Sequence, residues 1–112
     1  MRGSRTASEP RDEEGRPYHV RVSKADAARV ALLAGDPGRV PLMARSLEGA
    51  RSVSSNREFA VSAGRAGSEK VLVVSTGIGG PATAIAVEEL ARQGVEVMVR
   101  VGTCGAINPD LE

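Results

Sequence analysis

The chain has 112 residues, of which 41% are hydrophobic and 26% are charged, and its formal net charge is +1. This balance is typical of one small globular domain, and with one tyrosine and one phenylalanine it disfavours nucleic-acid binding. The single cysteine, Cys104, excludes an internal disulfide and a zinc site of several thiolates, so we expect a cytoplasmic protein. No signal-peptide core and no apolar run near the ~20 residues of a membrane span is found, so we expect no membrane association.

The chain is predicted to begin with a solvated tail over residues 1–17, where arginines alternate with acidic residues, followed by one domain over 18–112. Residues 18–22 are predicted to be extended, and Ser23 is predicted to cap a turn. Val30–Ala34 is a short apolar strand that runs into glycine-rich residues 35–39. Because Pro37 suits a first helical position and Asp36 can cap it, a helix is predicted over residues 37–47.

Alternating apolar and polar residues between 51 and 74 predict a hairpin, with its turn at 65–69 and a buried strand at 71–74. Residues 75–80 then form a glycine-rich turn, and Pro81 suits the start of a helix that extends to about residue 93. Backbone amides without partners and the positive end of the helix dipole would meet at this turn. The pattern predicts an anion site there.

A further apolar strand is predicted at 95–101 and carries Arg100 near its end. An unpaired charge inside such a strand would cost several kcal/mol, so Arg100 predicts an anionic partner. Its planar guanidinium fits phosphate oxygens. Three strand ends thus carry glycines and two carry arginines, which predicts phosphate binding at the carboxyl edge of a parallel sheet.

Other interpretations of the glycine turn remain open. It can serve tight packing of strand on helix, and Gly77, Gly79 and Ala82 nominally fit a dinucleotide-binding pattern. Pro81 and the position of Arg100 disfavour a dinucleotide-binding oxidoreductase fragment, because an acidic ribose ligand would be expected after the second strand.

Single residues also have non-functional interpretations. Arg39 and Arg57 can be surface charges, and His19 can be an exposed residue without a ligand. Cys104 is expected to be a small buried residue, because His19 is the only histidine that could serve it as a base. Glu88 and Glu89 are expected on the polar side of their helix.

Two helices, and a strand at 95–101 that is expected to be central in the sheet although it lies close to the C-terminus, indicate an α/β fold and the first half of a larger domain. Four motifs carry a resemblance that covers residues 18–108: Gly-Asp-Pro-Gly-Arg at 35–39, Asn-Arg-Glu-Phe at 56–59, the stretch 75–90, and Arg-Val-Gly-Thr-Cys-Gly-Ala at 100–106. In these motifs the chain resembles the nucleoside phosphorylase family of purine and uridine enzymes, with bacterial uridine phosphorylases the more similar branch. The resemblance covers the N-terminal half of that family only.

The resemblance implies a three-layer αβα fold with a mixed, largely parallel central sheet. It implies a pentosyltransferase that catalyses reversible phosphorolysis of a nucleoside, with uridine and phosphate giving uracil and ribose 1-phosphate. No organic cofactor is implied, and inorganic phosphate is the co-substrate. The residues that recognise the base would lie beyond Glu112, so the alternative is a non-catalytic chain that keeps phosphate-binding and oligomer-forming elements.

Residue roles also follow from the resemblance. Phosphate would be bound by Gly35, Arg39, Arg100, Val101, Gly102 and Thr103, and by Arg57 from a neighbouring subunit. Arg39 and Arg100 would act electrostatically, without a covalent nucleophile. The nucleoside would contact Tyr18, His19, Thr103 and Gly105, with His19 crossing a subunit interface of a homo-oligomer, a hexamer or its dimers. Glu58 and Ile78 match positions of a monovalent cation site for potassium, although Ala82 replaces the serine expected there.

Overall fold

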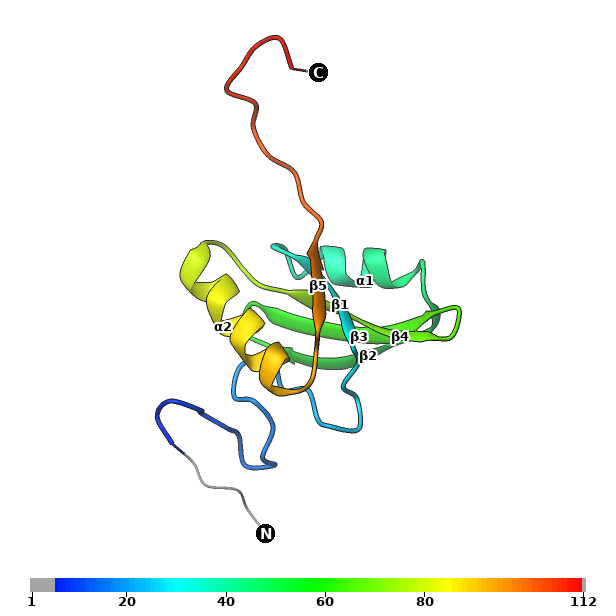
Figure 1. Ribbon diagram of the computed structural model, residues 1–112, viewed down its shortest axis with the longest axis vertical. Helices are drawn as coiled ribbons and strands as arrows, with labels where there is room; N and C mark the ends of the chain where they lie inside the picture. Colours follow the sequence, from blue (N-terminus) through cyan, green and yellow to red (C-terminus); the bar gives the residue numbers. More distant parts are fainter. Residues whose placement is uncertain (1–5, 112) are drawn as a thin grey trace.

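The computed structural model describes residues 6–111, and within them five strands form one sheet flanked by two helices (Figure 1). In chain order the elements are β1 (Val30–Ala34), α1 (Arg39–Ala44), β2 (Glu48–Asn56), β3 (Phe59–Ala66), β4 (Glu69–Ser75), α2 (Gly80–Arg92) and β5 (Val97–Arg100). The strand order across the sheet is β2-β3-β4-β1-β5.

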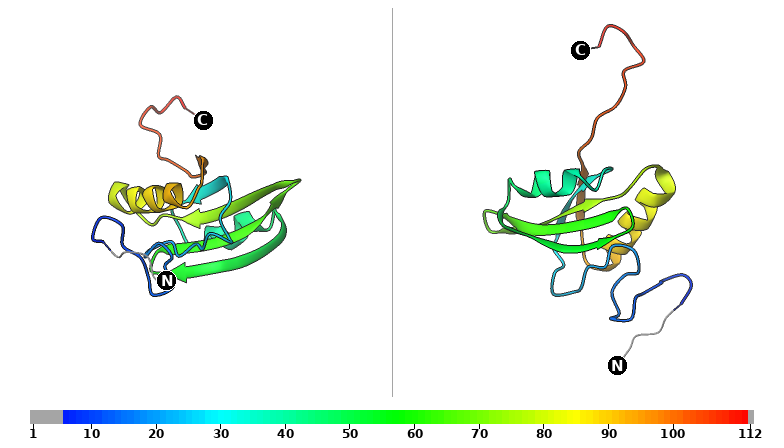
Figure 2. Two further views of the ribbon diagram at one scale, coloured as in Figure 1. Left: turned by 60° about the horizontal axis from the view of Figure 1, so that its bottom comes forward. Right: turned by 180° about the vertical axis from the view of Figure 1, so that it is seen from behind.

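The sheet is mixed. Strand β1 pairs in parallel with both β4 and β5, whereas β2, β3 and β4 pair antiparallel and curve together (Figure 2). The expected α/β class is confirmed. The predicted hairpin is wrong in extent: β2 begins at Glu48 and a tight turn at residues 57–58 makes a three-stranded meander. Most of β2 is exposed, so its apolar alternation is too weak to mark both ends of the strand.

The core lies on both faces of the sheet because successive strand residues point in opposite directions. Leu72 and Val74 of β4 pack with Ala86 and Leu90 of α2 on one face. Val73, between them in sequence, packs on the other face with Val40 and Ala44 of α1. The result is the predicted helix-sheet-helix layering, with both helices placed by the apolar residues of β1 and β4.

Helix α1 is shorter than predicted. It begins at Arg39, after Gly38 as N-cap, and no side chain caps it. Asp36 instead accepts a hydrogen bond from the amide of Gly38 at 2.9 Å, which forms a turn that mimics a cap two residues early. Helix α2 begins and ends within one residue of the predicted bounds.

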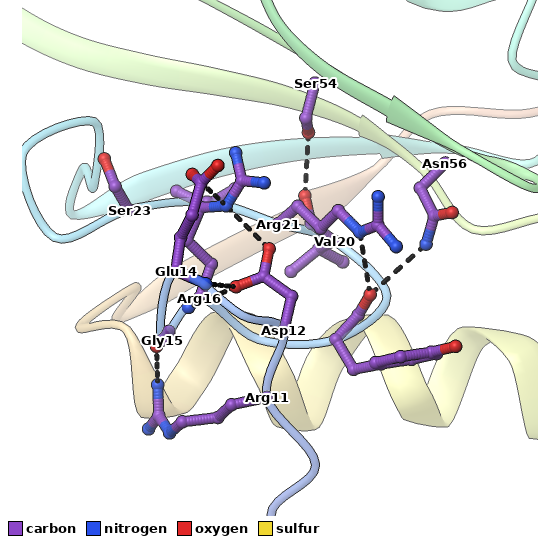
Figure 3. A network of polar contacts seen from close by, with 12 residues as sticks. Arg11, Asp12, Glu14, Gly15, Arg16, Val20, Arg21, Ser23, Ser54 and Asn56 are labelled. Atoms are coloured by element: carbon purple, nitrogen blue, oxygen red, sulfur yellow. Dashed lines mark hydrogen bonds and ion pairs between the residues drawn. The ribbon is translucent and has the colours of Figure 1, made fainter. Parts of the chain in front are cut away.

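The segment before β1 is folded onto β2. Residues 6–17, predicted as a solvated tail, make two isolated β-bridges, Thr6–Glu9 and Arg11–Pro17. Asp12 accepts hydrogen bonds from Glu14 and Arg16 and closes the turn of the second bridge (Figure 3). Ser54 of β2 donates a hydrogen bond to the carbonyl of Val20 at 2.8 Å (Figure 3). Residues 18–20 form a turn instead of the predicted extended piece. The rest of the predicted tail, residues 1–5, lies outside the described residues.

The predicted turn at Ser23 is present and also carries an ion pair. The Ser23 hydroxyl accepts a hydrogen bond from the amide of Asp26, and the Asp26 carboxylate accepts hydrogen bonds from the Ser23 hydroxyl and, at 2.5 Å, from Arg51 of β2. The hydrogen bond from Arg51 lowers the pKa of Asp26 below its ordinary value, against an opposing effect of burial. A carboxyl whose pKa is lower in the folded state contributes stability above its unfolded-state pKa, and this contribution is lost as the pH falls through the folded pKa.

We therefore expect the free energy of unfolding to fall more steeply below about pH 4 in the wild-type chain than in Arg51→Ala. Urea unfolding followed by circular dichroism at pH 6 and pH 3 measures both decreases. Equal decreases in the two chains would show that the Asp26–Arg51 pair does not contribute to acid sensitivity.

Strand β5 lies at the edge of the described sheet, not at its centre as predicted. Val97 and Val99 are 41% and 47% exposed, and Val101, just after the strand, is 49% exposed. Residues 101–111 are exposed and run away from the body of the molecule (Figure 1). Neither helix of the described part has the length and apolar character needed to cross a membrane.

Candidate functional site

An open cavity of about 690 Å³ lies where the carboxyl ends of β1, β4 and β5 meet. Parallel strands end at the same edge of a sheet, so the loops that follow them face one another there. The lining residues are Gly35, Asp36, Pro37, Arg39, Glu58, Gly77, Ile78, Gly79, Thr83, Arg100, Gly102 and Thr103. The four residues on which the predicted anion site mainly depends, Gly35, Arg39, Arg100 and Thr103, therefore share one cavity.

The glycine turn after β4 is hydrogen-bonded to the loop that follows β1. The amide of Gly77 donates to the carbonyl of Gly35 at 2.9 Å, so it is not among the free amides that the turn was predicted to offer. Gly77 has a φ of +74°, and a Cβ there would lie 2.6 Å from Cγ of Glu58. A side chain at this position would be strained and would push Glu58 out of place.

Hydrogen-bond donors without partners line the cavity. The amide of Gly35 donates to no acceptor among residues 6–111, and neither Arg39 nor Arg100 has a carboxylate within 4.0 Å in that range. Nη2 of Arg100 lies 3.7 Å from the position that a Cβ on Gly35 would occupy. Two guanidinium groups and one backbone amide are thus available to an external anion.

The reason given for Arg100 from the sequence is wrong. Arg100 is exposed, because β5 is an edge strand and residues 101–111 do not cover it, so its charge has no large desolvation penalty to offset. Its candidacy rests instead on its place in the cavity, beside Gly35.

Two carboxylates also line the cavity. Asp36, which the sequence indicated only as a helix cap, and Glu58, predicted for a cation, have no cationic partner within 4.0 Å among the described residues. Ile78 also lines the cavity, and the residue is 99% exposed. No cluster of three metal-ligating side chains occurs in the described part of the chain. Thr83 was missed; its hydroxyl donates to the carbonyl of Gly79 at 3.0 Å.

A second group of predicted site residues lies apart from the cavity lining. The guanidinium carbon of Arg57 lies 5.7 Å from the ring centre of Tyr18, and the Tyr18 ring packs edge-on against His19 at 5.1 Å. None of the three lines the cavity. Arg57 has a φ of +53°, which fits its place as the first residue of the two-residue turn between β2 and β3. We call Tyr18, His19 and Arg57 the aromatic cluster.

The remaining candidates differ from expectation. Val101 and Gly105 are exposed and do not line the cavity. Cys104 is exposed, not buried, since it follows the last strand. Glu89, expected on the polar side of α2, is 4% exposed, because the N-terminal segment covers that face of the helix.

Comparison with known proteins places this arrangement in a family. A model of the phosphorylase superfamily matches residues 29–112, which includes every residue that lines the cavity. The chain belongs to the phosphorylase superfamily. Relatives in this superfamily include a uridine phosphorylase of Thermococcus kodakarensis, 45% identical over 96% of this chain, and a guanosine phosphorylase of Halorubrum lacusprofundi, 43% identical over 84% of it. The uridine phosphorylase of Escherichia coli is 42% identical over 84% of the chain.

Membership in the superfamily confirms the predicted family and argues against a dinucleotide-binding oxidoreductase. The chain spans 39% of the length of the Thermococcus and Halorubrum relatives and 38% of that of the Escherichia coli relative. The cavity lies within the residues that the superfamily model matches, whereas Tyr18 and His19 of the aromatic cluster precede them.

Proposed function

We propose that this chain provides the phosphate-binding part of a nucleoside phosphorylase that acts on uridine. The observation that carries the proposal is the shared cavity of Gly35, Arg39, Arg100 and Thr103. The relatives named uridine phosphorylase support uridine as the nucleoside substrate. The relative named guanosine phosphorylase shows that the base can differ within the superfamily. One free thiol is compatible with the cytoplasm as the proposed compartment.

In the proposed reaction, a phosphate oxygen forms a bond to the anomeric carbon while the bond from that carbon to the base nitrogen breaks and its electron pair leaves with the base. Positive charge develops on the sugar, so the dianion must be held in line on the opposite side. Arg39 and Arg100 would hold its oxygens, and the amide of Gly35 and the hydroxyl of Thr103 would complete the site. Glu58 and Ile78 remain the candidates for a monovalent cation near this phosphate.

The position of the aromatic cluster supports a site shared between subunits. Arg57, His19 and Tyr18 lie together but outside the cavity of their own chain. In the proposed homo-oligomer they would reach the cavity of a neighbouring chain, with Arg57 on the phosphate and His19 on the sugar. One chain would then contribute a phosphate cavity and, on another surface, the residues that close its neighbour's cavity.

Phosphate-dependent release of uracil from uridine tests the proposal. The 112-residue chain is assayed alone and together with a polypeptide that carries the remaining sequence of the Thermococcus relative. We expect uracil release only in the mixture, and only with phosphate present. Because the chain covers only a small share of its relatives' length, a second candidate is a chain that binds phosphate without turnover. Phosphate binding without uracil release from the mixture would support this second candidate. Absence of phosphate binding would contradict both.

A further inference from the structure

Glu89 is a buried carboxylate that the proposed reaction does not use. Its side chain is 6% exposed, on the face of α2 that the N-terminal segment covers. Oε1 accepts hydrogen bonds from the backbone amides of His19 at 2.9 Å and Val20 at 3.1 Å. Oε2 lies 2.6 Å from Nδ1 of the His19 ring. One carboxylate therefore holds both the backbone and the side chain of His19.

The His19 ring is also held on its other sides. The Tyr18 ring packs against it at 5.1 Å with an angle of 77° between planes, and Phe59 packs against it at 5.6 Å and 68°. The His19 side chain is 18% exposed. Packing of this kind restricts the ring to one orientation, so the contact between Nδ1 and Glu89 is maintained.

The chemistry of this contact decides where the proton of the ring lies. An ionised carboxylate has only acceptor atoms, so the hydrogen between Nδ1 and Oε2 belongs to Nδ1. In the neutral ring Nε2 then carries a lone pair and can only accept. No hydrogen bond from the described residues reaches Nε2.

We propose that Glu89 is a positioning residue that keeps the proton of neutral His19 on Nδ1, so that Nε2 accepts a hydrogen bond from a ligand hydroxyl. The identity of that hydroxyl rests on the proposed function: it is the 5′-hydroxyl of a nucleoside bound in the cavity of a neighbouring chain. Glu89 thereby acts on the nucleoside without touching it, through the tautomer of His19.

The chain contains one histidine, so nitrogen NMR of the imidazole reports His19 alone. Spectra are taken at a pH where titration of the same signals shows the ring to be neutral. We expect the Nδ1–H tautomer in the wild-type chain. In Glu89→Gln the carbonyl can still accept from the two backbone amides while the NH₂ group faces Nδ1, so the proton is expected to move to Nε2.

Glu88→Gln is the matched control, because Glu88 is the neighbouring residue of α2 and its side chain is 69% exposed. It is expected to keep the wild-type tautomer. An Nε2–H tautomer in the wild-type chain, or an unchanged tautomer in a folded Glu89→Gln chain, would overturn the proposal. Should Glu89→Gln fail to fold, the wild-type spectrum still decides.

Steady-state kinetics of the assembled enzyme test whether Nε2 of His19 binds the 5′-hydroxyl of the nucleoside. Glu89→Gln is expected to raise the KM for uridine about tenfold, with kcat and the KM for phosphate nearly unchanged. The effect is expected to disappear with 5′-deoxyuridine, which lacks the hydroxyl that Nε2 would accept from. An equal loss on both nucleosides would overturn the role in hydroxyl recognition. A wild-type assembly without turnover would instead contradict the proposed function and leave the NMR result standing.

Discussion

Replacing Arg100 with alanine is expected to weaken phosphate binding at least about tenfold, or roughly 1.4 kcal/mol. Hydrogen bonds to charged groups contribute about 1.5–3 kcal/mol each, and Arg100 has no carboxylate partner in the described chain that would compete for its guanidinium. Arg100→Lys keeps the charge but loses the planar fork, so an intermediate loss is expected. Phosphate titration followed by calorimetry measures all three chains.

Arg45→Ala is the control for this prediction. Arg45 is exposed just after α1 and does not line the cavity, yet its removal changes the net charge by the same amount. We expect phosphate affinity close to that of the wild type. Equal losses for Arg45→Ala and Arg100→Ala would show that phosphate responds to overall charge and not to a specific site.

The second large effect is expected on the free energy of unfolding, when Phe59 is replaced with alanine. Phe59, the first residue of β3, is 1% exposed and packs in the core between the sheet and α2, with His19 against its ring. Truncation to alanine removes most of this buried apolar surface and leaves a cavity, which typically costs about 3–5 kcal/mol. Because the chain has no tryptophan, urea unfolding is followed by far-ultraviolet circular dichroism.

Leu42→Ala serves as the comparison for Phe59. Leu42 lies on α1 and is 56% exposed, so its truncation removes little buried surface and places a better helix former in the helix. Its effect on the free energy of unfolding is expected to be below about 1 kcal/mol. A Phe59→Ala change no larger than that of Leu42→Ala would mean that the chain lacks the fixed core described above.

The cavity could be predicted from the sequence because its residues follow parallel strands. Where an apolar run leads into glycine and arginine, the sequence locates both the end of the strand and the functional side chain next to it. Gly35, Arg39 and Arg100 were therefore predicted together. Which strands lie side by side in the sheet cannot be read from the residues of any one strand. Sequence alone therefore put β5 in the centre of the sheet and treated Arg100 as buried, whereas β5 pairs only with β1 and lies at the edge of the described sheet.

The buried face of α2 shows a second limit. Ala86, Glu89, Leu90 and Gln93 recur at helical spacing and are all buried, although two of them are polar. Glu89 binds the backbone of His19 and Val20, and Gln93 donates to the carbonyl of Val22 at 2.7 Å. Their polarity assigns Glu89 and Gln93 to solvent, although their spacing places them on the same face as Ala86 and Leu90. Both polar residues are buried as hydrogen-bond partners of the N-terminal segment, Glu89 for the backbone amides of His19 and Val20 and Gln93 for the carbonyl of Val22.

The two exposed valines of β5 and Val101, just after it, have a consequence for handling the isolated chain. Unpaired amides and carbonyls along an edge strand, flanked by exposed β-branched side chains, form a template onto which another polypeptide can add a strand. Val97, Val99 and Val101 place such a template on one flank of the sheet, without the lysine, proline or bulge that blunts many natural edges. Expressed by itself, the chain would therefore tend to self-associate through β5 as its concentration rises.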